Sequence, residues 1–179
     1  MKPINKYRFK ITVIGNGSVG KTSLIERYTR GGFKREYVKT IGAQFSEYLK
    51  EIKGDQIKLI LWDIAGQDDF NFLRPSFYKE SRAVIIVYSL EENDLGKRSF
   101  EDIPKWHDDI KYFCGDIPVM VFANKVDLIN EKSIDRINLE KLVKKRNFLG
   151  YCITSAKTGE GVTDAFDRII QEIHDKSKV

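Results

Sequence analysis

A glycine-rich segment near the N-terminus carries the clearest chemistry in the sequence. Residues 15–22 read Gly-Asn-Gly-Ser-Val-Gly-Lys-Thr and match the full P-loop pattern of strand, glycine-rich loop and helix. Glycines let successive backbone N–H groups turn inward, and the helix that follows adds its unpaired N–H groups and the positive end of its dipole. Lys21 supplies a charge for the outer phosphates, and the hydroxyl of Thr22 suits Mg²⁺. The pattern predicts a polyphosphate site and leaves the base open.

Two polar segments that follow short apolar runs could select the base. Residues 124–127 read Asn-Lys-Val-Asp, and residues 155–157 read Ser-Ala-Lys. The carboxylate of Asp127 can accept hydrogen bonds from N1–H and the exocyclic amino group of guanine, whereas adenine presents a lone pair at N1. The stem of Lys125 can lie over the purine, Asn124 can tie this loop to the P-loop, and N–H groups of residues 155–157 can reach guanine O6. Together the three loops predict a guanine nucleotide.

Two stretches without regular pattern, residues 31–41 and 66–76, hold candidates for a switch and for hydrolysis. Asp63, at the end of an apolar run, can hold a metal ion through water, and Thr40 offers it a hydroxyl. Gly66 can bring its N–H against a terminal phosphate, and Gln67 can orient a water molecule for in-line attack. Both stretches would be held only while a γ-phosphate is present.

Short apolar runs alternate with helical patterns along the chain, which predicts an α/β fold with a mostly parallel sheet covered on both faces. We expect strands over residues 9–14, 44–53, 57–62, 83–90, 119–123 and 151–155, with a hairpin turn at residues 54–56. We expect helices over residues 21–29, 100–112 and 138–147. A last helix carries an apolar stripe at steps of three and four residues, made of Val162, Ala165, Phe166, Ile169, Ile170 and Ile173.

The composition fits one globular domain. The chain has 179 residues, of which 41% are hydrophobic and 32% charged, and its longest apolar runs are far too short to span a bilayer. The net charge of +5 comes from scattered basic residues, which favours a solvated surface over a nucleic-acid site. Two cysteines without metal-like spacing and an N-terminus without a secretion signal predict a cytoplasmic protein.

With these motifs in their order, the chain resembles the Ras superfamily of small GTPases and is most similar to the Rab family, from about residue 9 to residue 174. The resemblance implies a single P-loop NTPase (G) domain over residues 1–179, with a six-stranded, mostly parallel sheet, one antiparallel edge strand and about five helices on both faces. It implies binding of GTP and GDP with Mg²⁺ and slow hydrolysis of GTP to GDP and phosphate, in membrane trafficking or signalling. Because the P-loop carries no arginine, a partner's arginine would add about 10³–10⁵-fold to the rate.

The resemblance also implies the site residues and the partners. Phe33 falls where the family packs an aromatic ring on the base, and Tyr37 where a tyrosine closes over the phosphates. The implied nucleotide-binding residues are Gly15, Gly17, Ser18, Val19, Gly20, Lys21, Thr22, Ser23, Phe33, Tyr37, Thr40, Gly66, Asn124, Lys125, Asp127, Leu128, Ser155, Ala156 and Lys157. The implied metal ligands are Thr22, Thr40 and Asp63, and the residues assigned to catalysis are Lys21, Thr40 and Gln67. The implied partners are exchange factors, GTPase-activating proteins and effectors, with no nucleic acid, and the chain is expected to be a monomer.

Several alternatives stay open at this point. The Rab leaning rests on an aromatic trio, Phe45, Trp62 and Phe77, which either contacts effectors or packs the hairpin face. Ile64 and Asp68 depart from the usual Rab residues and would support a non-enzymatic GTP-binding module. An ATP-using P-loop enzyme is a further alternative. The carboxylate at position 127, directly after Val126, conflicts with it.

The C-terminal residues lack the cysteines to which Rab proteins attach prenyl groups, so we expect no lipid anchor in this chain. Lysine at position 2 excludes N-myristoylation as well. Either a lipidated tail was removed, or the chain is a prokaryotic or otherwise divergent relative that never had one. Peripheral membrane association would then need a partner or the missing tail.

Overall fold

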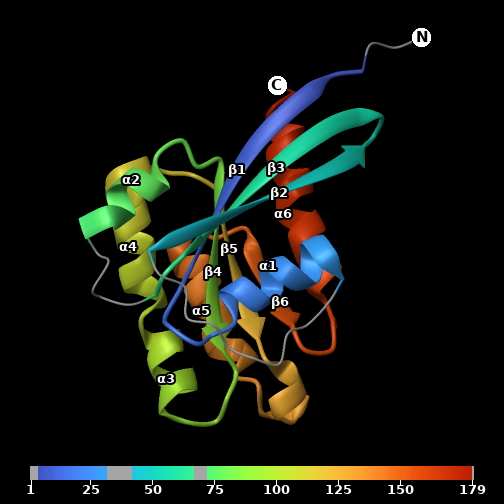
Figure 1. Cartoon of the computed structure of the whole chain (residues 1–179). Coiled ribbons are helices and arrows are strands. Elements are labelled where there is room, and N and C mark those ends of the chain that lie inside the picture. The colour runs from blue at the N-terminus through green and yellow to red at the C-terminus, as the bar shows by residue number, and fades with distance from the viewer. Residues whose placement is uncertain (1–3, 32–41, 67–71, 179) are drawn as a thin grey trace.

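A computed structural model describes residues 4–31, 42–66 and 72–178, and one six-stranded sheet runs through it (Figure 1). The strand order is β2-β3-β1-β4-β5-β6. β2 pairs antiparallel with β3 at one edge, and all other neighbours pair in parallel. The strands are β1 (Lys6–Ile14), β2 (Ala43–Ile52), β3 (Asp55–Ile64), β4 (Ala83–Ser89), β5 (Val119–Asn124) and β6 (Gly150–Thr154). The expected sheet, with its antiparallel edge strand, is confirmed.

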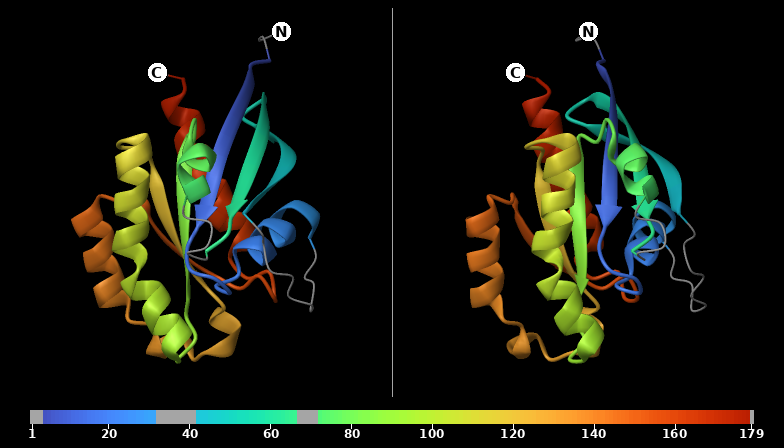
Figure 2. Two further views of the ribbon diagram at one scale, coloured as in Figure 1. Left: turned by 60° about the vertical axis from the view of Figure 1, so that its left-hand side comes forward. Right: turned by 90° about the vertical axis from the view of Figure 1, so that its left-hand side faces the viewer.

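Helices cover both faces of the sheet (Figure 2). In the described ranges they are α1 (Lys21–Arg30), α2 (Arg74–Tyr78), α3 (Asp94–Glu101), α4 (Ile103–Cys114), α5 (Arg136–Arg146) and α6 (Val162–Lys176), with short 3₁₀ helices η2 (Val126–Leu128) and η3 (Glu131–Ser133). α1 and α6 pack on one face, and α2, α4 and α5 on the other. None of these helices is long and apolar enough to cross a bilayer.

Two local features differ from the sequence-based expectation. The helix expected over residues 100–112 is the end of α3 followed by α4, because Pro104 lies in the first turn of α4 and proline is poorly tolerated inside a helix. The β2–β3 turn consists of Lys53 and Gly54, with φ of 52° and 84°, rather than residues 54–56. Two positive φ values in a two-residue turn match the right-handed twist of the strands, so Ile52 pairs directly with Asp55.

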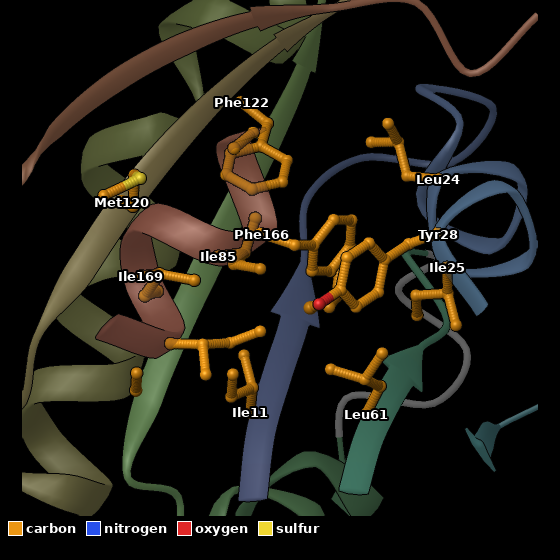
Figure 3. Packing of buried hydrophobic residues seen from close by; sticks show 14 of the residues in the cluster. Ile11, Leu24, Ile25, Tyr28, Leu61, Ile85, Met120, Phe122, Phe166 and Ile169 are labelled. Carbon is orange, nitrogen blue, oxygen red and sulfur yellow. The ribbon is translucent and has the colours of Figure 1, made fainter. Parts of the chain in front are cut away.

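The apolar stripe of α6 packs into the larger of two hydrophobic cores. All six of its predicted members are buried. Phe166 stacks on Tyr28 of α1, with ring centroids 4.4 Å apart, and meets Phe122 of β5 edge-on at 5.2 Å (Figure 3). This packing fixes α1, and with it the segment that precedes α1, relative to the sheet.

The parallel strands bring their carboxyl ends to one edge of the sheet. β1, β3, β4, β5 and β6 therefore direct the segments that follow them to the same side of the molecule (Figure 1). Open α/β sheets bind ligands at this edge. The motifs singled out in the sequence follow β1, β3, β5 and β6.

Candidate functional site

The P-loop (residues 15–22) joins β1 to α1, as its pattern requires. Gly15 has φ of 137°, and a Cβ built on it would lie 2.1 Å from the carbonyl oxygen of Val87 in β4, so no other residue fits there. α1 begins at Lys21 and has neither a side-chain cap nor an acidic residue in its first turn. The backbone N–H groups of this terminus and its partial positive charge suit an anion.

Lys21 is buried inside the P-loop, with 7% of its surface exposed. Its Nζ donates hydrogen bonds to the carbonyl oxygens of Gly15, at 2.8 Å, and Asn16, at 2.7 Å. Burial lowers the pKa of the Lys21 amine to about 8, against the opposing effect of the Asp63 carboxylate. The site therefore holds a desolvated cation that a phosphate group would stabilise.

Thr22 and Asp63 come together beside Lys21. The hydroxyl of Thr22 donates a hydrogen bond to Oδ2 of Asp63, which is buried near the end of β3. These are hard oxygen donors of the kind Mg²⁺ takes. Within residues 4–31, 42–66 and 72–178 no group of three or more His, Cys, Asp or Glu side chains could hold a metal ion. The donor set fits Mg²⁺ sites that use few protein ligands together with substrate phosphates.

Asn124 connects three loops from the end of β5. Its Nδ2 donates to the carbonyl oxygen of Val19 in the P-loop, at 2.9 Å. Its Oδ1 accepts hydrogen bonds from the hydroxyl of Thr154, at 3.1 Å, and from the backbone N–H of Ala156, at 3.2 Å. The tie between this asparagine and the P-loop that the sequence suggested is present.

The Asp127 carboxylate is oriented by the loop after β6. Its Oδ1 accepts a hydrogen bond of 2.6 Å from the hydroxyl of Ser155, which is fully buried. Oγ of Ser155 in turn accepts from the backbone N–H of Thr158, at 3.0 Å. One carboxylate oxygen is thus fixed by the protein, which orients the plane of the group.

Two residues at this edge escaped the sequence analysis. Arg27 of α1 donates from Nε to the carbonyl oxygen of Ala156, at 2.8 Å, and from Nη2 to that of Lys157, so it holds the loop after β6. Glu91, which follows β4, accepts from Nζ of Lys125 at 2.7 Å and from the hydroxyl of Ser89 at 2.8 Å. Burial opposes ionisation of Glu91, but these bonds outweigh it, and the pKa of its carboxyl is lowered. The position of Glu91 after a parallel strand was the signal that could have found it.

The remaining sequence candidates divide into placed and unplaced residues. Gly66 lies against the P-loop, since a Cβ built on it would be 2.3 Å from the carbonyl oxygen of Gly15. Ser18, Leu128 and Lys157 are exposed around the site, while Gly17, Gly20 and Ser23 lie partly buried within it. Phe33, Tyr37, Thr40, Gln67 and Asp68 lie outside the described residues.

The aromatic trio forms a contiguous group on the sheet face. The Phe45 and Trp62 rings lie 5.6 Å apart, and the Trp62 and Phe77 rings 5.7 Å apart. Phe45 is 57% exposed, and Nζ of Lys10 lies 4.6 Å from the centroid of the Trp62 ring. The trio packs against itself, and part of it faces solvent.

The sheet order, the P-loop and the loops gathered after the parallel strands define the class of α/β P-loop nucleotide-binding proteins. The sequence profile of the Ras family matches residues 10–175. The chain therefore belongs to the Ras family, and it is a small GTPase that binds guanine nucleotides.

The sequence of the chain is similar to those of Rab proteins. It is 32% identical over 168 residues to Ras-related protein Rab-12 of Mus musculus, an alignment that covers 93% of this chain and 68% of that protein. The Homo sapiens protein of the same name is also 32% identical over 168 residues, covering 93% of this chain and 67% of the relative. Ras-related protein Rab-18-B of Danio rerio is 36% identical over 166 residues, covering 92% of this chain and 78% of the relative. As a member of this family, the chain is a switch that works with regulators and effectors.

Proposed function

We propose that the chain is one G domain, a monomer, that binds GTP with Mg²⁺ and slowly hydrolyses it to GDP and phosphate. Its two nucleotide states would differ in their binding of effectors, and the similarity to Rab proteins supports a role in membrane trafficking, at the cytoplasmic face of a membrane. Exchange factors and GTPase-activating proteins would set the rates of the cycle. This proposed function involves no nucleic acid as a binding partner.

One observation carries the proposal: the desolvated ammonium of Lys21, the Thr22–Asp63 pair and the uncapped start of α1 converge at the strand ends. Asn124 fixes this phosphate cradle to the loops that hold Asp127 and Ala156. A phosphate tail and a purine can therefore be held by one rigid frame. Preorganised donors of this kind cost no reorganisation during a reaction.

In the proposed mechanism, Lys21 and the P-loop N–H groups bind the phosphates and neutralise the charge that develops on them. Thr22 and Thr40 would hold Mg²⁺ directly, and Asp63 would hold it through water. Bound there, Mg²⁺ would neutralise charge on the phosphate oxygens. The N–H of Gly66 would contact the γ-phosphate.

Gln67, the residue after Gly66, would orient the attacking water. The same γ-phosphate contacts would hold residues 31–41 and 66–76 in the GTP state. Gly17 has no side chain, which would leave room for Gln67 and for an arginine from a partner.

Single-turnover release of phosphate tests hydrolysis. The protein is loaded with GTP labelled in the γ-phosphate, and release is followed over hours after Mg²⁺ is added. We expect one phosphate per protein, with GDP left bound. A chain that retains GTP unchanged over the same period would instead be the non-enzymatic binding module that Ile64 would support.

The buried lysine gives a pH prediction. In the nucleotide-free protein the pKa of Lys21 is about 8, lowered by burial from the ordinary value of 10.5. Phosphate would raise it again, so between these two values binding requires uptake of a proton, and affinity for GDP falls as pH rises above about 8. Calorimetry at about pH 8.5 in two buffers of different ionisation heat should show an uptake of roughly three-quarters of a proton.

At about pH 7 the lysine already carries its proton, so its contribution to uptake should vanish there, which provides the control. Equal binding heats in the two buffers at the higher pH would contradict the assignment of Lys21 to the phosphates.

Glu91 gives a second prediction, because it holds the lysine proposed to lie over the purine. The Lys125 and Glu91 side chains are only 22% and 21% exposed, so their ion pair is partly shielded from water. Glu91→Gln removes the charge and keeps the size, and we expect GDP to dissociate about three- to tenfold faster. Release of a fluorescent GDP derivative measures this, with the exposed neighbour Glu92→Gln as control. Equal release rates in the wild type and Glu91→Gln would rule out this role.

A further inference from the structure

Asn16 is a P-loop residue whose side chain has no role in the proposed mechanism. Its amide is nevertheless hydrogen-bonded at both ends. Its Nδ2 donates to Oδ2 of Asp102, between α3 and α4, at 2.6 Å. Its Oδ1 accepts from Nε1 of Trp106 in α4, at 2.8 Å. Because one end must donate and the other must accept, these two partners fix the orientation of the amide.

The backbone of Asn16 lies between Lys21 and the start of residues 66–76, the second of the two candidate switch stretches and called the second switch stretch below. Its carbonyl oxygen accepts a hydrogen bond from Nζ of Lys21. On the other side, a Cβ built on Gly66 would lie 2.4 Å from the carbonyl carbon of Asn16, so the two backbones are in close contact. A shift of Asn16 would therefore move both the acceptor of Lys21 and the surface against which Gly66 packs.

A residue of α2 lies over the face of the Trp106 ring. Cζ of Arg74, the first residue of that helix, lies 4.2 Å from the centroid of the Trp106 ring. Arg74 is 4% and Trp106 6% exposed, so the stacked pair is nearly free of water, and Nη1 of Arg74 lies 3.9 Å from Oδ2 of Asp109. A desolvated contact between a guanidinium and an indole is worth more than an exposed one.

We propose that Asn16 is a positioning residue, and that Asn16, Trp106 and Arg74 form a relay that couples the P-loop to α2. Trp106 holds the P-loop through its N–H and contacts α2 through its ring. When nucleotide exchange moves Gly66 or α2, the relay transmits the movement to the loop that holds Lys21. The inference rests on the proposed function, because it gives the second switch stretch a route to the phosphate site.

Packing alone explains part of this arrangement, since a buried indole N–H needs an acceptor. It does not explain why that acceptor is the side chain of a P-loop residue, 90 positions earlier in the sequence. A merely structural role predicts loss of stability alone. A relay predicts altered nucleotide kinetics and a spectroscopic change at the ring.

A double-mutant cycle separates the two. Trp106→Phe keeps a ring beneath Arg74 but removes the N–H donor, and Asn16→Ala removes the acceptor. We expect each to speed the release of a fluorescent GDP derivative about three- to tenfold. Since both remove the same link, the double variant should change no more than the larger single change.

The matched control is Asn138→Ala in α5, which also loses a 2.6 Å bond between an asparagine amide and an aspartate, here Asp135. Its release rate should equal that of the wild type. The proposal is overturned by wild-type release in Trp106→Phe, by a double variant whose effect is the product of the two single effects, or by equal acceleration in the control.

Fluorine NMR gives a readout that a structural role would not move. The chain has two tryptophans, so labelling with 5-fluorotryptophan gives two signals, and loss of one in Trp106→Phe assigns it. We expect the Trp106 signal to differ between GDP and a GTP analogue with a β,γ-imido bridge, and the difference to disappear in Arg74→Lys. An identical shift in both states, or a difference that survives in Arg74→Lys, would overturn the relay. Because the analogue is not hydrolysed, an inactive wild type would refute the proposed hydrolysis and leave this result readable.

Discussion

Asp127→Asn is expected to lower the affinity for GDP by about 100-fold or more and to raise that for xanthosine diphosphate. The carboxylate would accept two hydrogen bonds from guanine, and bonds to a charged acceptor contribute about 1.5–3 kcal/mol each. An asparagine presents an amide N–H group to a guanine donor, but the same group can donate to the 2-oxo group of xanthine. The change should leave the loop intact, because the asparagine Oδ1 can still accept from Ser155, which now lies 2.6 Å from the aspartate.

Competition between the two diphosphates for nucleotide-free protein measures this shift. Asp135→Asn is the matched control, since Asp135 caps α5 by accepting from the N–H of Asn138, which an asparagine can also do. It should behave as the wild type. Should Asp127→Asn keep its preference for guanine over xanthine, the base is chosen elsewhere.

Gln67→Leu is expected to slow single-turnover hydrolysis of GTP by about 10- to 100-fold, while the affinity for GTP stays unchanged. The proposed role of Gln67 is to orient water, and leucine has a similar size but no hydrogen-bonding group. Misplacing one reactant by about 1 Å is enough for a loss of this size. Because binding is assigned to the P-loop and the base loops, the loss should fall on the rate alone.

Gln171→Leu serves as the control, because Gln171 is a partly exposed residue of α6 that bonds Asp175 in its own helix. Measured by phosphate release under single-turnover conditions, it should match the wild type. An unchanged rate in Gln67→Leu would remove that residue from the mechanism, and a parallel loss of GTP affinity would assign it to binding.

Local pattern predicted most of the fold. Buried strands such as β4 and β5 are short, almost wholly apolar runs, and the stripe of α6 has the period of a helix. Local pattern failed at two positions, one where a residue acts against its usual preference and one where a proline interrupts a helical pattern. Lys53 adopts a positive φ that lysine rarely takes, so the sequence indicated a longer turn than the one present. Pro104 divides an apolar helical pattern that would otherwise read as one helix.

The candidate site was predictable to the extent that its residues lie in short motifs. Asn124 could be connected to the P-loop because its motif follows a strand whose end faces that loop. Arg27 and Glu91 belong to the site through partners 129 and 34 positions away, and Asn16 of the P-loop reaches Trp106, 90 positions away. Such contacts depend on how the helices pack against the sheet, which no local spacing encodes.

The nucleotide retained by the purified, folded protein tests the central claim most directly. If the P-loop encloses a polyphosphate whose base is chosen by Asp127, chromatography of the denatured protein should yield about one GDP or GTP per chain, with no adenine nucleotide. A chain that carries no nucleotide, and that binds GDP and GTP more weakly than micromolar when Mg²⁺ is supplied, would contradict the account.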